Sequence, residues 1–155
     1  MSIFGKDDQA IQKFAETLPI PEFPQCSFSK SKPLASAKIA IVTTAALHQD
    51  GAGFEVGDSD YHYETLSRSA RNLKLGHHSV NFDRGGFAAD INVVYPIDRL
   101  EEMLSSGSIG AVADTHYSFA GNQSASVSEI RLDSGPHCAQ QMLNEHVDVV
   151  LLTGT

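Results

Sequence analysis

Lys38–Thr44 reads KIAIVTT, and this stretch decides the fold. It is short, nearly all apolar and rich in β-branched residues, which is typical of a strand buried on both faces of a parallel sheet. Ile91–Tyr95 (INVVY) and Val147–Leu152 (VDVVLL) have the same character. Ile109–His116 (IGAVADTH) is a further short strand that leads into a polar loop. These runs together predict a mainly parallel sheet.

Helical patterns lie between the predicted strands. Asp98–Leu104 (DRLEEML) is predicted as a helix that ends at the Ser-Ser-Gly after it. Ser134–His146 is predicted as a helix with Ala139, Met142 and Leu143 facing inward. Strands that alternate with helices predict a single α/β domain, whose sheet is flanked by helices in a Rossmann- or flavodoxin-like three-layer arrangement.

The predicted α/β domain spans residues 38–155, and residues 1–37 form an N-terminal helix and a proline-rich connector. The helix covers Asp8–Leu18, where apolar residues recur at helical spacing. Two segments have no period and many glycines or aspartates, and we predict that both are irregular: His48–Tyr61 and Asp83–Asp90.

Composition narrows the classes of partner. The chain has 155 residues, and its 19 acidic and 11 basic residues give a net charge of −8. An acidic surface argues against nucleic-acid and anionic-membrane partners. No run approaches the roughly 20 apolar residues that span a bilayer, and no secretory signal pattern is present. Two distant cysteines, Cys26 and Cys138, indicate a reduced, cytoplasmic protein.

Ligands of parallel sheets bind beyond the carboxyl ends of the strands. This rule places four segments on one predicted rim: Thr43–His48, Tyr95–Asp98, Asp114–Ser118 and Thr153–Thr155. The candidate substrate-binding residues on or beside this rim are Thr43, Thr44, His48, His78, Asp83, Arg84, Asp90, His116, Ser118, Thr153 and Thr155.

Three hypotheses compete for these polar side chains. His78 and His116 could form a metal site with Asp83 or Asp90, although no compact ligand motif such as HExxH is present. The same histidines and aspartates could serve as acid–base or substrate-anchoring groups. The third hypothesis is that they cap loops and hold the rim together.

Sequence motifs offer no nucleophile within the chain. GxSxG, Walker and GxGxxG motifs are absent from the sequence. His137 precedes Cys138, but adjacent residues of a helix point in different directions. We therefore expect Cys138 to be a buried, inert thiol.

Four blocks of the sequence resemble a known family in the same order along the chain. They are KIAIVTTAALH (Lys38–His48), HHSVNFDRGGFAADINVVYPIDRLEEM (His77–Met103), GSIGAVADTHYSFAG (Gly107–Gly121) and VDVVLLTGT (Val147–Thr155). Together they resemble selenoprotein B of glycine, sarcosine and betaine reductases, which is also similar to a subunit of D-proline reductase.

The resemblance implies reductive deamination of a small amino acid or betaine. A selenocysteine or cysteine attacks the carbon that bears the amine and displaces it, and the carboxymethyl group then passes to a partner selenoprotein. The electrons come from a thioredoxin-like dithiol. The resemblance thus implies partner reductase subunits and requires no metal or other cofactor. Homo-oligomerisation is a further expectation. Arg84 or a neighbouring group of the rim is expected to bind the substrate carboxylate, because a guanidinium can do so bidentately.

In the family the redox residue follows the last of these strands, and here we expect it just after Thr155. The 38–155 domain is then incomplete at its C-terminus, because an in-frame UGA codon for selenocysteine was taken as a stop. A naturally short protein is the alternative. Two other functions stay open: an enzyme with a metal held by the rim histidines and aspartates, and a non-catalytic binding or assembly module.

Overall fold

The computed structural model describes residues 7–17, 28–49, 51, 53–54, 60–77, 84–121, 123 and 129–154. Its helices are α1 (Asp7–Thr17), α2 (Arg84–Ala89), α3 (Ile97–Ser105) and α4 (Gly135–Asn144). Shorter helical turns are η1 (Leu34–Ser36), η2 (Ile91–Val93) and the π-helical η3 (Ile130–Ser134). The strands are β1 (Lys38–Thr43), β2 (Leu47–His48), β3 (Tyr63–Ser67), β4 (Lys74–Leu75), β5 (Ala111–Val112), β6 (Thr115–Phe119) and β7 (Val149–Thr153).

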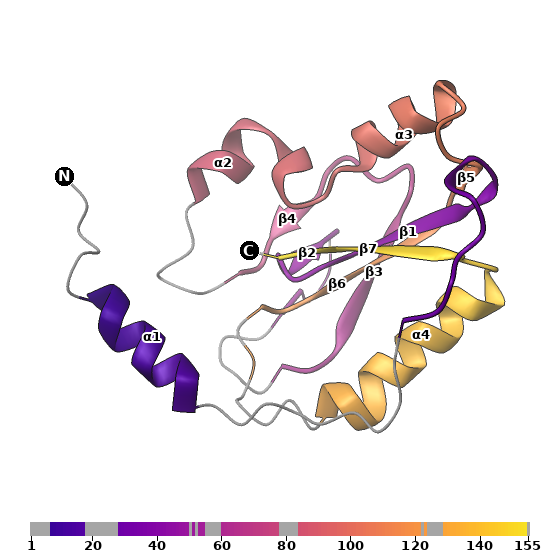
Figure 1. Cartoon of the computed structure of the whole chain (residues 1–155). Helices are drawn as coiled ribbons and strands as arrows, with labels where there is room; N and C mark the ends of the chain where they lie inside the picture. The colour runs from indigo at the N-terminus through magenta and orange to yellow at the C-terminus, as the bar shows by residue number, and fades with distance from the viewer. Residues whose placement is uncertain are drawn as a thin grey trace.

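Strand β1 is the centre of a mixed sheet that lies between α3 and α4 (Figure 1). It pairs in parallel with β7 on one side and with β5 and β6 on the other. Strand β3 pairs antiparallel with β6, and β2 and β4 form a separate two-stranded sheet. The predicted α/β class and mainly parallel sheet are therefore confirmed. None of the described helices is long and apolar enough to cross a membrane.

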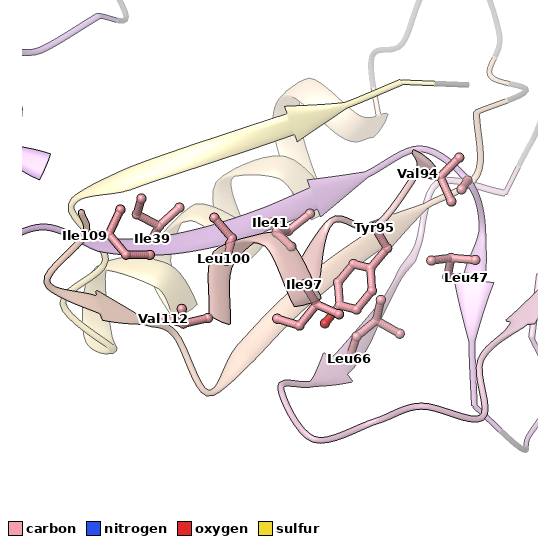
Figure 2. Packing of buried hydrophobic residues seen from close by; sticks show 11 residues of the cluster. Ile39, Ile41, Leu47, Leu66, Val94, Tyr95, Ile97, Leu100, Ile109 and Val112 are labelled. Atoms are coloured by element: carbon pink, nitrogen blue, oxygen red, sulfur yellow. The ribbon is translucent and has the colours of Figure 1, made fainter. Parts of the chain in front are cut away.

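One face of the sheet packs against α3. Ile39 and Ile41 of β1 belong to one buried cluster with Ile97 and Leu100 of α3 (Figure 2). Leu66, Tyr95, Ile109 and Val112 extend this cluster. Complete burial of an aliphatic side chain contributes roughly 1.5–3 kcal/mol, so this cluster is the main apolar core.

The other face packs against α4, with Cys138 and Met142 facing inward. The prediction that Ala139 and Leu143 face inward was wrong, since both are exposed. The pairs 138/142 and 139/143 form two apolar stripes about 100° apart on a helix with 3.6 residues per turn. Contact with Tyr117 selects the first stripe, and sequence periodicity cannot distinguish them.

The predicted strand Ile91–Tyr95 is instead the turn η2, although Val94 and Tyr95 are buried as expected. Asp90 caps the turn, because its carboxylate accepts hydrogen bonds from the Asn92 main-chain N at 2.9 Å and from Asn92 Nδ2 at 2.8 Å. Asn92 Oδ1 in turn accepts from the Asp98 N at 3.1 Å. These local hydrogen bonds compete with strand formation, and the segment therefore forms a helical turn.

The segment Asp83–Asp90 was predicted to be irregular, and this prediction was also wrong, because Arg84–Ala89 form helix α2. Its two glycines lower helix propensity. Phe87 compensates by packing against the apolar core. Tertiary packing therefore overrides local propensity at this helix.

The predicted strand Ile109–His116 is also different in the structure, which has two strands, β5 and β6, in two registers. Ile39 pairs with Val112, whereas Val42 pairs with Tyr117, so three steps along β1 match five along its partner. The two extra residues disrupt the ladder and leave the amide of Ile41 without a main-chain acceptor. His116 supplies one, since its Nδ1 accepts from the Ile41 N at 3.0 Å.

The His116 ring is fully buried, and this environment defines its charge state. Burial lowers the pKa of His116 from 6.5 to about 4. An imidazole that accepts at Nδ1 is neutral and carries its proton on Nε2. The side chain of a neutral histidine thus replaces a strand carbonyl in the middle of the sheet.

The protonation of His116 predicts a pH-dependent stability. Between pH 6.5 and about 4, the unfolded chain binds a proton at His116 that the folded chain does not, so the free energy of unfolding falls as pH drops through this window. A pKa difference of this size corresponds to about 3 kcal/mol. Urea unfolding at a series of pH values measures it.

Two variants separate His116 from the other titrating groups. His116→Asn keeps an acceptor near the position of Nδ1 but does not titrate, so its unfolding free energy should depend less on pH. His116→Leu leaves the Ile41 amide unpaired and should lose roughly 1–3 kcal/mol at neutral pH. An equal pH dependence in the wild type and His116→Asn would refute the assignment.

Candidate functional site

The order of the strands marks one candidate place on the sheet for a ligand. From β1 the chain passes through α3 on one face to β5 and β6, and then through α4 on the other face to β7 (Figure 1). Strands β5/β6 and β7 therefore lie on opposite sides of β1. The carboxyl ends of β1 and β7 form a topological switch point, which is where open α/β sheets bind ligands.

The loop after β1 is held by buried hydroxyl groups. Thr43 Oγ1 accepts from the Ala45 N at 3.2 Å, and Ser118 Oγ accepts from the Leu47 N at 2.6 Å. Between them Ala46 has a φ of 51°, which is unusual for a residue other than glycine. The buried hydroxyl groups of Thr43 and Ser118 thus hold the main chain of the loop in place through these two hydrogen bonds.

Two glycines allow close contacts around this loop, one with the main chain of Ala46 and one with the ring of His48. The Gly76 N donates to the Ala46 O at 2.8 Å, and a Cβ at Gly76 would lie 2.9 Å from the same oxygen. Gly53 has a φ of 66°, and a Cβ there would lie 2.8 Å from the His48 ring. His48 is therefore packed beside the rim in the β2–β4 sheet, half-buried.

Thr153 connects three segments at the switch point. Its carbonyl accepts from the Thr44 N at 3.0 Å, which extends the β1–β7 ladder beyond β1. Its Oγ1 donates to the Val94 O at 2.7 Å, which fixes the connection between η2 and α3. Gly154 follows, exposed, with no described atom within 4 Å of an added Cβ. The end of β7 is thus anchored through Thr153.

An apolar pocket of about 470 Å³ lies between α4 and the carboxyl ends of the strands. It is lined by Val42, Thr44, Phe119, Ala120, Gly121, Gln123, Ile130, Gly135, Cys138, Met142, Val150 and Leu152. Burial raises the pKa of Cys138 to about 12, so this thiol is not ionised at neutral pH. The geometry agrees with an inert thiol at Cys138. Cys26 lies outside the described residues.

A second, wider pocket of about 770 Å³ lies near the start of α4, and Tyr61, His62, Tyr63, Leu132, Asp133, Ser134 and His137 line it. The hydroxyl of Tyr63 lies 2.8 Å from Nδ1 of His137. Burial and the neighbouring Cys138 raise the pKa of Tyr63, so the phenol keeps its proton at neutral pH. His62 contacts the Asp60 carboxylate and stacks on Phe54.

Sequence reasoning missed this second pocket. The run Asp60–Glu64 (DYHYE) alternates ionisable and aromatic residues, and this pattern was a usable signal. The strand predictions rested on apolar runs, and Asp60–Glu64 is not one of them. The following strand β3 also lacks a clear alternation of apolar and polar residues, so no strand was predicted there.

The other predicted site residues are dispersed. Arg84 is exposed at the start of α2, with Nη2 3.4 Å from the His77 O. Asp90 caps η2, and its hydrogen bonds with Asn92 lower the pKa of its carboxyl. His116 lies inside the sheet, and its Nε2 has no partner among the described residues. His78, Asp83 and Thr155 are outside the described residues.

The structure therefore brings Thr44 and Thr153 together and gives Thr43, Ser118, Asp90 and His116 bonds within the protein. The described part of the chain contains no group of three or more His, Cys, Asp or Glu side chains arranged to hold a metal ion.

Removal of the Thr153 hydroxyl should loosen the rim. Thr153→Val keeps the side-chain shape but leaves the Val94 carbonyl without this donor, and we expect a loss of about 1 kcal/mol in unfolding free energy. Thr65→Val, at an exposed position of β3, controls for the general effect of a threonine-to-valine change in a strand. Urea unfolding compares the two. Equal stabilities of these variants would show that the bond does not hold the rim.

Comparisons with known proteins show the family of the chain. The family model of glycine/sarcosine/betaine reductase selenoprotein B matches residues 9–155, which include β1, β7 and every segment of the rim. D-proline reductase subunit gamma from Acetoanaerobium sticklandii is 30% identical over 125 residues, which cover 79% of this chain and 50% of that protein. The chain thus spans about half the length of this relative. No solved structure matches. The chain belongs to the glycine/sarcosine/betaine reductase selenoprotein B family.

Proposed function

We propose that this chain provides the substrate-binding rim of a reductase that removes the amine from a small amino acid or betaine, such as glycine, sarcosine, betaine or D-proline. One observation carries this proposal: Thr153 joins the ends of β1 and β7 and the connection after η2 at the switch point of the sheet. Family membership supports the reaction class, and the topology supports the location.

The strand order supports a finer assignment of the fold. With β1 between β5/β6 and β7, and with helices on opposite faces, the arrangement matches the first three strands of the flavodoxin-like order 2-1-3. We propose a flavodoxin-like sheet on this basis. In that order the ligand lies at the ends of the strands equivalent to β1 and β7.

Reductive deamination needs a soft nucleophile at this point. The nucleophile attacks the carbon that bears the nitrogen, and the C–N bond breaks with its electron pair going to the nitrogen. The amine of glycine, sarcosine or betaine leaves, whereas the nitrogen of D-proline stays attached through the opened ring and gains a proton. After the carbon group has passed to the partner selenoprotein, a thioredoxin-like dithiol supplies two electrons that cleave the carbon–selenium bond. The carbon gains a proton, the selenolate is regenerated, and the dithiol becomes a disulfide.

Cys138 does not suit the role of nucleophile, because burial raises its pKa to about 12. We propose instead a selenolate or thiolate that follows β7, where the resemblance locates the redox residue. Gly154 leaves open space there, as no described atom lies within 4 Å of an added Cβ.

Arg84 is the proposed anchor for the substrate carboxylate. It is exposed at the start of α2, a helix that contacts η2 and hence the segment bonded to Thr153. Its hydrogen bond to the His77 O is long, at 3.4 Å, so a bidentate carboxylate is a stronger partner for the guanidinium.

Binding of small zwitterions to the isotopically labelled chain tests this proposal by NMR titration. Glycine, sarcosine, betaine or D-proline should shift the amide signals of Thr44, Thr153 and Gly154 in a saturable manner. Acetate, which lacks the nitrogen, and methylamine, which lacks the carboxylate, should bind more weakly. No saturable shift at the rim with any of the four zwitterions would overturn the proposal.

Arg84→Gln tests the anchor separately. Loss of a charge-assisted hydrogen bond of roughly 1.5–3 kcal/mol corresponds to about tenfold to hundredfold weaker binding. Arg99→Gln is the matched control, since Arg99 is exposed on α3 and is paired with Glu102. Equal affinities of the two variants would exclude Arg84 as the anchor.

A further inference from the structure

The wider pocket near the start of α4 is built by three separate segments. Tyr61 and Tyr63 come from the chain at the start of β3, Leu132 and Asp133 from η3, and His137 from α4. Strand β6 lies between β3 and the two strands, β1 and β7, that end at the proposed substrate rim. A volume of about 770 Å³ is within the range of small-molecule sites. The pocket is therefore a second candidate binding site, away from the rim.

The aromatic wall of this pocket is held in place by its neighbours. The ring of Tyr63 lies 5.5 Å from that of Tyr117 and 5.4 Å from that of Phe119. Its hydroxyl lies 2.8 Å from Nδ1 of His137, whose ring is 5.8 Å away and tilted by 37°. Tyr61, 46% exposed, adds a second phenol ring to the wall. Rings that are fixed before a ligand arrives lose little conformational entropy on binding.

The wall formed by η3 is a π-helical turn that depends on a glycine. The Gly135 N donates to the Ile130 O, five residues earlier, and a Cβ at Gly135 would clash with this oxygen. π-helical turns are rare and are found frequently at functional sites. Here the turn carries Leu132 and Asp133, which both line the pocket.

The charges around the pocket favour a cation. Asp133 lines it, and none of the described lining residues is Lys or Arg. Two further carboxylates lie close by, because the ring of His62 contacts Asp60 through Nδ1 and lies with Nε2 3.5 Å from Glu64. The face of an aromatic ring is also negative. An anion is therefore repelled here, whereas a cation is attracted to both the carboxylates and the rings.

The hydrogen-bonding groups of the walls are largely occupied within the protein. Tyr63 and His137 bond with each other, and His62 is paired with Asp60. A primary ammonium ion that leaves water needs acceptors for its N–H groups, and an unmet hydrogen bond is costly. A quaternary ammonium ion has no N–H group and binds to aromatic faces directly. The walls thus favour a quaternary ion over a primary one.

We propose that this pocket binds a quaternary ammonium ion against the rings of Tyr61 and Tyr63, with Asp133 balancing its charge. The site recognises the charged, methylated nitrogen and requires no carboxylate on the ligand. It is independent of the proposed reductase function, because its residues differ from those of the rim.

NMR titration of the isotopically labelled wild-type chain with tetramethylammonium chloride tests the site. The amide signals of Tyr61, Tyr63 and His137 should shift in a saturable manner, and ammonium chloride at the same ionic strength should bind more weakly. Choline should bind more tightly than its neutral carbon analogue, in which a carbon atom replaces the charged nitrogen. Equal affinities for choline and this analogue would overturn the proposal, as would the absence of a saturable shift with tetramethylammonium.

Tyr61→Leu keeps apolar surface in the pocket but removes one aromatic face. Loss of a cation–π contact corresponds to about twofold to thirtyfold weaker binding of tetramethylammonium. Phe28→Leu is the matched control, since Phe28 is 87% exposed and does not line the pocket, and it should bind as the wild type does. Because Tyr61 is also partly exposed, the variant should fold, which circular dichroism verifies. Equal affinities of the two variants would refute the site.

Arg84→Gln separates this site from the proposed substrate anchor. Arg84 does not line the pocket, so this variant should bind tetramethylammonium with the wild-type affinity even if it binds the zwitterions more weakly. A loss of tetramethylammonium binding in Arg84→Gln would place the ion at the rim and overturn the proposal.

Discussion

Strand β1 is the centre of the sheet, and the buried amide of Ile41 within it finds its acceptor in Nδ1 of His116, 3.0 Å away. A buried amide without a partner costs about 1–3 kcal/mol, and a central strand has no water to relieve it. The two-residue register change between β5 and β6 would create that cost. A neutral imidazole removes it, and the same register change brings Thr43 beside Ser118.

The geometry of the rim follows from that register. Ser118 accepts from the Leu47 N and Thr43 from the Ala45 N, so the loop after β1 turns back across the sheet at a defined place. Thr153 then holds the end of β7 against this loop and against Val94. Polar side chains that look like ligand groups in the sequence thus mostly hold the loops.

Sequence patterns predicted the elements whose causes are local. KIAIVTT became β1, the last apolar run became β7, and the predicted helices at residues 8–18, 98–104 and 134–146 became α1, α3 and α4. The family resemblance predicted from four sequence blocks is confirmed.

The failures have long-range or side-chain causes. The bonds among Asp90, Asn92 and Asp98 turned an apolar run into η2. The break between β5 and β6 depends on pairing with β1, which is about 70 residues earlier in the chain. His116 was placed on the rim because its strand was predicted to end there, whereas β6 continues to Phe119 and keeps the ring inside the sheet.

Amide hydrogen exchange at Ile41 tests the central claim most directly. If His116 Nδ1 completes the ladder, the Ile41 amide exchanges as slowly as the amide of Ala113, which donates to the Ile39 O at 2.9 Å in the same sheet, and both exchange only when the whole domain unfolds. An Ile41 amide that exchanges much faster than that of Ala113, through local opening at neutral pH, would contradict the account.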